Sequence, residues 1–248
     1  SKEYDMTLLH YHLALLAVVA VRDQPPGVDA KSQRERRESL RYVLVGSWAV
    51  MRTPSILTIT SGGIALSAGN TILGIWGGPY LNDVHGLGQT ERGAVLIFMA
   101  CSGILGHFLY GQASRVIGSL KSLVLGGTAA ISVIMGTLAL LPTPSVITVT
   151  VLLAALGMAC GFPTIMLAHS RALVPDYLIG RALTTVNTGV MLAIAAMQMV
   201  IGGIIGSVMI SSDGQATAGG YRTAFGFFAV MAVLTFVIYS RAKDAKPS

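Results

Sequence analysis

Charged residues are scarce in this chain: only 11% of its 248 residues are Asp, Glu, Lys or Arg, whereas 53% are apolar. A soluble domain carries about 25% charged residues, so this chain cannot cover a water-facing surface with polar side chains. Charged side chains are absent from five windows, 53–82, 93–114, 122–170, 182–212 and 223–240. Since roughly 20 apolar residues cross a bilayer, the sequence predicts a polytopic, all-α membrane protein.

Cysteine and catalytic motifs are scarce as well. Cys101 and Cys160 are the two cysteines, and both lie inside charge-free windows. A disulfide framework or a metal site needs more ligands, so we predict two small core residues, no metal and no cofactor. The sequence has no His-x3-His pair, no Gly-x-Ser-x-Gly and no phosphate-binding glycine loop, and its charge-free windows hold no carboxylate. These absences argue against an enzyme.

The charge-free windows predict six spanning helices. The turn Leu141-Pro142-Thr143-Pro144 divides the longest window in two, because proline ends helices. The predicted spans are 54–78, 93–113, 121–141, 145–169, 182–209 and 222–240. They form a half-bundle at 53–241, which is followed by a tail at 242–248.

Two further segments precede this half-bundle. We expect the apolar run 1–21 to be the end of a truncated membrane helix, or an interfacial helix. Segment 22–52 is a basic linker whose second half is amphipathic. It fits an anionic membrane surface and a solvated connector equally well.

The distribution of Lys and Arg predicts the orientation. If the linker faces the cytoplasm, the cytoplasmic segments hold fourteen Lys and Arg residues, and the outer loops between spans hold only Arg92 and Arg222. Such a bias places both ends of the six-span unit in the cytoplasm of a cell membrane. The net charge of +6 is therefore assigned to orientation and to lipid head groups, and no nucleic-acid partner is expected.

A short basic turn joins the second and third spans, and it resembles a known motif. Six spans after a basic linker are similar to the C-terminal half of a major facilitator superfamily (MFS) transporter. The family's loop motif has the form Gly-x-x-x-Asp-Arg-x-Gly-Arg-Arg/Lys. Its counterparts here are Gly111, Arg115, Gly118 and Lys121, and segments 21–27, 76–81 and 174–182 also resemble family landmarks.

Two departures from the family accompany this resemblance. The acid of the loop motif is absent, with Ser114 and Arg115 at the candidate positions. In the family that acid helps to latch the cytoplasmic side, so we expect a weak latch or one that uses only the cation. The resemblance also implies twelve helices in two rocking halves, of which this chain supplies one. The implied partner is an N-terminal half or a second copy.

Uncharged polar residues inside the spans are the candidate site. Asn187 and Gln198 are eleven residues apart, which places them within about 20° on one helical face. With Asn70 they form a substrate path in one interpretation and interhelical hydrogen bonds in the other. Trp76 and Tyr80 are either aromatics near the outer mouth of that path or anchors at the membrane interface.

His107 is the titratable side chain well inside a span. A proton-coupling role and a hydrogen bond near the interface are both open.

The sequence-based hypothesis is a permease half for secondary active transport of a small solute, with or without a co-transported ion or proton. The alternatives are a truncated or non-transporting scaffold, a homodimeric half-transporter and, least favoured, an intramembrane enzyme.

Overall fold

The computed structural model describes residues 46, 48, 50, 52–211 and 218–246, with the side chains of 208–211 excepted. Within these residues all regular elements are helical, and six segments are long and apolar enough to cross a membrane. The predicted all-α bundle of six spans is confirmed. The predicted segment 1–21 and most of the linker at 22–52 lie outside the described residues.

The first span is longer than predicted and is interrupted. It comprises α4 (Pro54–Thr60), α5 (Gly62–Thr71), a π-helical turn (Ile72–Trp76) and α6 (Gly77–His85). In the wide turn the amide of Gly77 bonds to the carbonyl of Ile72. This shift of register accommodates Pro79, which has no amide hydrogen, so the helix continues to Gly86, where φ is 66°.

The second and third spans meet at the basic turn singled out in the sequence. Helix α7 (Gln89–Ile117) ends at Gly118, whose φ of 65° suits a residue without a side chain. Helix α8 (Leu120–Leu140) begins after Ser119, whose hydroxyl accepts a hydrogen bond from the amide of Ser122 at 3.1 Å. The turn is therefore fixed by a left-handed glycine and a serine cap.

The fourth span is also broken. Helix α9 (Val146–Ala159) and helix α10 (Pro163–Ala172) are separated by residues 160–162, and Pro163 opens the second helix. A 3₁₀ turn (Asp176–Leu178) leads into α11 (Ile179–Ser211), and α12 (Ala218–Tyr239) is the last span. The predicted boundaries missed the break because residues 160–162 lie inside a charge-free window.

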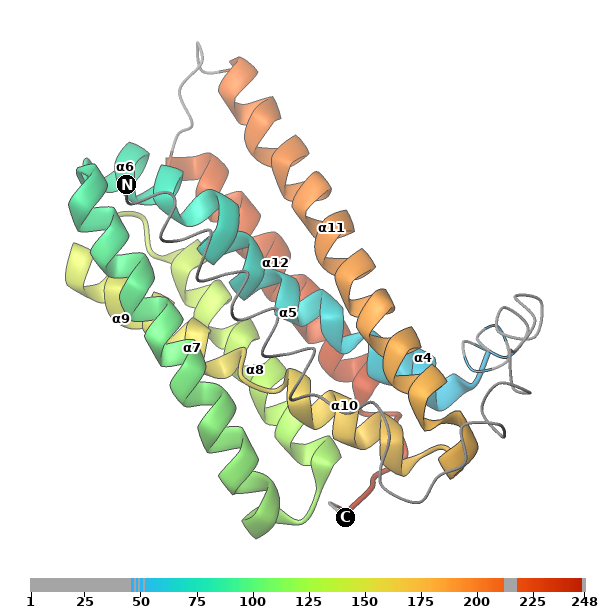
Figure 1. Ribbon diagram of the computed structural model, residues 1–248. Coiled ribbons are helices and arrows are strands. Elements are labelled where there is room, and N and C mark those ends of the chain that lie inside the picture. Colours follow the sequence, from blue (N-terminus) through green and yellow to red (C-terminus); the bar gives the residue numbers. More distant parts are fainter. Residues whose placement is uncertain (1–45, 47, 49, 51, 212–217, 247–248) are drawn as a thin grey trace, which may run out of the picture. The chain divides into compact units, whose positions relative to one another are not determined.

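The helices pack chiefly in pairs, with α8 against α12, α7 against α9 and α5 against α11 (Figure 1). Glycines allow the α7–α9 contact, since a Cβ on Gly157 or Gly161 would overlap the backbone of α7. Helix backbones approach closely at such small-residue spacings in lipid. By contrast, a Cβ on Gly202 or Gly206 of α11 would meet nothing within 4 Å.

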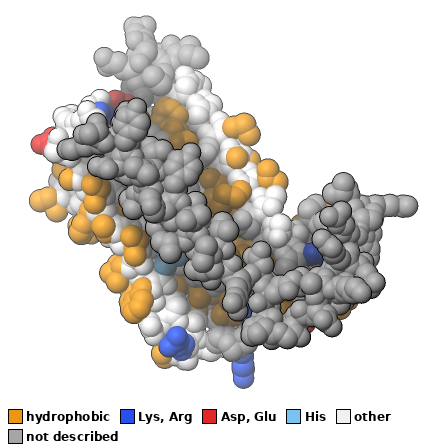
Figure 2. Space-filling model, viewed as in Figure 1, with side chains coloured by type: hydrophobic (Ala, Val, Ile, Leu, Met, Phe, Trp, Pro, Cys, Tyr) orange, Lys and Arg blue, Asp and Glu red, His pale blue; other side chains and the backbone are white. Residues whose placement is uncertain are grey.

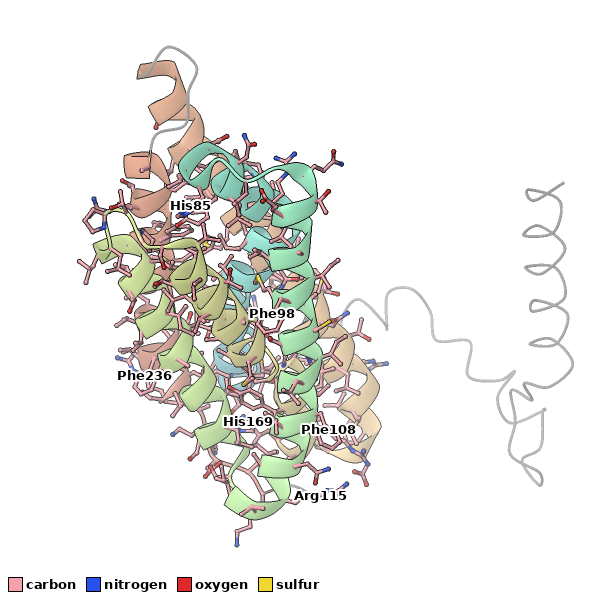
Figure 3. The ribbon with its side chains drawn as sticks, turned by 90° about the vertical axis from the view of Figure 1, so that its left-hand side faces the viewer. His85, Phe98, Phe108, Arg115, His169 and Phe236 are labelled. Carbon is pink, nitrogen blue, oxygen red and sulfur yellow. The ribbon has the colours of Figure 1, made fainter. Side chains whose placement is uncertain are left out.

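The outer surface is apolar along the spans. Val133 and Ile147 are 69% and 78% exposed, and groups of apolar side chains are visible on the part of the face in Figure 2 that is not grey. Arg115 and His85 lie at opposite ends of the bundle (Figure 3). We call the end with Arg115 the basic end and the other the opposite end. An apolar surface of this kind fits lipid.

Candidate solute cavity

A cavity of about 380 Å³ lies between α5, α7, the α9–α10 break and α11. This volume falls within the roughly 300–1,000 Å³ of small-molecule sites. Most of the lining is aliphatic side chains, methionine and glycine. The nitrogen-bearing side chains in the lining are Asn70, His107 and Asn187, which come from three different helices. Among the described lining residues none carries a permanent charge, so the cavity is apolar with three hydrogen-bonding groups.

Asn70 sits on α5 just before the π-helical turn. Its Nδ2 donates to the carbonyl of Leu66 at 3.0 Å, which fixes the carboxamide on its own helix. The side chain is exposed and lines the cavity. Its Oδ1 and second amide hydrogen therefore retain hydrogen-bonding capacity.

Asn187 lines the same cavity from α11. Its side chain is exposed and makes no hydrogen bond within the described part of the chain. The buried neighbours Val186 and Val190 hold this stretch of the helix against the rest of the bundle. The whole carboxamide, with two donors and one acceptor oxygen, is thus available to the cavity.

His107 contributes an imidazole from α7. Its Nδ1 lies 2.8 Å from the carbonyl oxygen of Gly103. A carbonyl can only accept, so Nδ1 carries the hydrogen and Nε2 of the neutral ring is an acceptor. The close approach of Gly161 to the amide of His107 presses the α9–α10 break against this turn of α7.

The break at residues 160–162 shapes one wall of the cavity. Cys160 and Pro163 belong to the lining. The hydroxyl of Tyr110 donates to the carbonyl of Ala159 at 3.3 Å, one of the carbonyls that the broken helix leaves without a partner in its own backbone. Phe162 packs edge-on against the same tyrosine, with ring centroids 6.0 Å apart. These two contacts hold the cavity wall formed by the α9–α10 break against α7.

The other predicted path residues lie outside this cavity. Gln198 is half-buried on α11, and Trp76 is half-buried at the π-helical turn. Tyr80 is only 3% exposed and packs edge-on against Tyr221 and Phe225. Of the six candidates, the cavity brings together Asn70, Asn187 and His107. Within the described residues no group of three His, Cys, Asp or Glu side chains is arranged to hold a metal ion.

Comparison with known proteins decides the family. The sequence profile of the Major Facilitator Superfamily matches residues 9–197, which is most of the chain. The chain belongs to the major facilitator superfamily. No curated protein gives a significant match.

Among the solved structures, this MFS chain is similar to the inward-open conformation of the xylose transporter XylE from E. coli. The TM-score is 0.62 at 16% identity, and the match covers 77% of this chain and 48% of that one. The chain thus spans about half the length of that transporter. At 16% identity, this match shows that the two chains share a fold and shows nothing about a shared solute.

The four residues that resemble the MFS loop motif lie in and beside the turn at the basic end. Gly118 is the left-handed residue of that turn, whereas Gly111 lies inside α7, where an added Cβ would meet nothing within 4 Å. Arg115 is exposed and stands in the last turn of α7. Lys121 stands in the first turn of α8, where its amide donates to Asp244 at 3.3 Å.

Sequence reasoning missed two residues of this MFS chain at the basic end. Asp244 accepts from the hydroxyl of Ser119 at 2.8 Å, and His169 is fully buried between α12 and the segment that follows it. Burial alone would raise the pKa of the Asp244 carboxyl. Hydrogen bonds from Ser119, Lys121 and Ala245 outweigh burial, so this pKa lies below its ordinary value of 3.8. In the sequence, only Ser119, a typical N-cap residue before α8, indicated a side-chain contact at this helix start.

Proposed function

We propose that this chain is one six-helix half of a secondary transporter that moves a small solute by alternating access. One observation carries the proposal: three helices bring Asn70, Asn187 and His107 to a single cavity. Membership of the superfamily supports it. In MFS proteins the solute site lies between two halves that rock about it. The chain acts as a carrier in this account, and catalysis has no part in it.

The three polar side chains hold the solute in this proposal. Asn187 offers donors and an acceptor, Asn70 offers its Oδ1, and the neutral His107 offers Nε2. Burying a charge against uncharged groups is costly, so this wall favours a neutral and largely apolar solute. A charged solute would take its counter-charge from the other half.

His107 is also the proposed coupling residue. Its Nδ1 already donates a hydrogen bond to the carbonyl of Gly103, so in this proposal an incoming proton binds at Nε2. That proton converts an acceptor facing the cavity into a donor and adds a positive charge. Solute binding and proton binding are then linked through one atom. Gln198 extends the polar path about three turns farther along α11, while Trp76 and Tyr80 have no part in it.

The proposed setting is the plasma membrane, with the basic end in the cytoplasm. The bias of Lys and Arg toward that end supports this orientation. The partner is a second six-helix bundle, supplied by an N-terminal half or by another copy. The open face of Gly202 and Gly206 on α11 would let a partner helix approach closely.

Uptake by the complete gene product in proteoliposomes tests the proposal. The probes are a neutral pentose, a neutral aromatic alcohol, an aromatic carboxylate and a quaternary ammonium ion. We expect saturable uptake of a neutral probe. Each lost hydrogen bond is worth about 1 kcal/mol, so Asn70→Ala with Asn187→Ala should lower the uptake efficiency about tenfold or more. Val133→Ala, on the lipid-facing side of α8, should leave it unchanged.

Two outcomes would count against this function. Equal uptake by the double variant and the wild type would show that the solute does not pass through this cavity. Absence of uptake for every probe, together with an unchanged thermal midpoint in the presence of each, would favour the non-transporting scaffold.

A further inference from the structure

The segment after α12 turns back onto the start of α8. The amide of Ala242 bonds to the carbonyl of Tyr239 at 2.9 Å, which ends the helix. The carbonyl of Ala245 then accepts from the amide of Leu120 at 3.1 Å. Asp244, between these two residues, accepts from the hydroxyl of Ser119. A backbone bond and a carboxylate bond therefore attach this segment to the α8 cap.

The negative charge of the Asp244 carboxylate also lies beside the positive end of the α8 helix dipole. An α-helix carries partial positive charge at its N-terminus, and the first turn of α8 contains no acidic residue. Oδ2 of Asp244 lies 2.8 Å from the hydroxyl of Ser119, and Oδ1 lies 3.3 Å from the amide of Lys121. The turn between α7 and α8 has no acidic residue of its own, and the carboxylate at this position comes from Asp244, 125 residues after Ser119 in the chain.

His169 joins a third helix to the same place. Its Nε2 lies 2.8 Å from the carbonyl oxygen of Lys243, and since a carbonyl only accepts, Nε2 carries the hydrogen. Nδ1 of the neutral ring accepts from the hydroxyl of Tyr239 at 2.9 Å. The ring is fully buried, so each bond is shielded from water. One side chain of α10 thus holds both the end of α12 and the segment that follows it.

Helix α10 is held near its C-terminal end by this attachment. It has only ten residues and is separated from α9 by the break at 160–162. Met166 and Leu167 on this helix line the cavity. Besides packing against α8 and α11, this helix is held near its end through His169, and a displacement of the helix would move the cavity wall.

We propose that Asp244 and the carbonyl of Lys243, with their partners Ser119 and His169, form a clasp that keeps the basic ends of α8, α10 and α12 together. The clasp stays closed while the half moves as a rigid body. The rigid-body movement rests on the proposed transport function, whereas the clasp rests only on the contacts described above.

Amide hydrogen exchange in the complete gene product tests the clasp directly. Asp244→Ala should raise exchange about tenfold in peptides covering 119–122, because the capping bonds at the α8 start are lost. Ser119→Ala, a surface change, should raise it in the same peptides. His169→Phe keeps a ring but loses both bonds and should raise exchange across α10. Lys246→Ala is the control and should match the wild type.

Wild-type exchange in both Asp244→Ala and Ser119→Ala would overturn the clasp. Failure of His169→Phe to fold would leave these two variants as the test.

A disulfide between Ser119→Cys and Asp244→Cys tests whether the clasp stays closed. The background carries Cys101→Ser and Cys160→Ala, and its uptake in reducing conditions is the reference. Oxidation should leave uptake within about twofold of the reference. Loss of uptake on oxidation that reductant restores would show that the clasp must open. If the wild type takes up no probe while exchange behaves as expected, the proposed function fails and the clasp stands.

Discussion

The hydroxyl of Tyr221 on α12 donates a hydrogen bond of 2.7 Å to Oδ2 of Asp83 on α6, joining the first and last spans at the opposite end. Tyr80 packs edge-on against Tyr221, with ring centroids 5.2 Å apart, and its hydroxyl lies 3.3 Å from Nε2 of His85. The last helix is therefore held at both ends, to the first span here and, through Asp244 and His169, to α8 and α10 at the basic end.

Tyr221→Phe tests the tie at the opposite end. The variant keeps the ring packing and loses the bond to the carboxylate of Asp83, so the bundle should lose about 1–2 kcal/mol of stability. Thermal unfolding in detergent should show a lower midpoint. Tyr177→Phe, at an 81% exposed tyrosine, is the matched control and should leave the midpoint unchanged. Identical midpoints for the two variants would show that the bond contributes nothing.

Gly161→Ala tests the close contact between α7 and the α9–α10 break. The added Cβ would lie 2.6 Å from the backbone nitrogen of His107, so the helices must separate. Overpacking of this kind costs about 1–3 kcal/mol. Gly111→Ala on α7, where a Cβ meets nothing within 4 Å, should instead be neutral or stabilising by up to about 1 kcal/mol. Unfolding midpoints in detergent check both, and a neutral Gly161→Ala would refute the account of this contact.

His107→Gln tests proton coupling. Glutamine keeps a hydrogen-bonding side chain at the cavity but cannot take up a proton. Uptake driven by an inward proton gradient should fall to the level seen without a gradient, while solute exchange across the membrane continues. His85→Gln is the control histidine, because His85 lies at the opposite end against Tyr80. Full gradient stimulation in His107→Gln would eliminate this residue as the coupling group.

The pH dependence of the clasp follows from the lowered pKa of Asp244. A carboxyl whose pKa is lower in the folded state stabilises that state above its unfolded pKa, and the contribution is lost as pH falls through the folded value. The folded value lies below 3.8, so the hydrogen bonds of Asp244 should be unchanged between pH 8 and pH 5 and should be lost only in stronger acid. A nitroxide at Lys246→Cys, with both native cysteines replaced, should report constant mobility over that range. In the His169→Phe background, where the clasp holds no imidazole, a rise in mobility between pH 7 and pH 5 would contradict this assignment.

Much of the fold was predictable because lipid imposes a simple rule on sequence. Windows without charge located all six spans, and Pro142 and Pro144 correctly divided the longest one. The helix interruptions were not predicted. The break at 160–162 lies inside a charge-free window, and the π-helical turn at Ile72–Trp76 depends on hydrogen-bond register. Neither introduces a charge.

The candidate site was predictable in part. Asn70, Asn187 and His107 stood out because polar side chains inside spans need partners or water. The burial of Tyr80 among Tyr221 and Phe225 could not be foreseen, since it depends on how α12 packs against the first span. Asp244 escaped notice because its partner Ser119 lies 125 residues away in the chain.

The accessibility of Asn187→Cys to a charged, water-soluble thiol reagent tests the central claim most directly, without knowledge of the solute. The measurement uses the complete gene product with Cys101→Ser and Cys160→Ala, in sealed vesicles. Val133→Cys, 69% exposed on the lipid-facing side of α8, is the control. If the cavity is a solute path, Asn187→Cys reacts at least about tenfold faster than the control, because only a wetted site admits a charged reagent. Equal, slow labelling at the two positions would mean that the cavity faces lipid or is sealed by packing, and the account would fail.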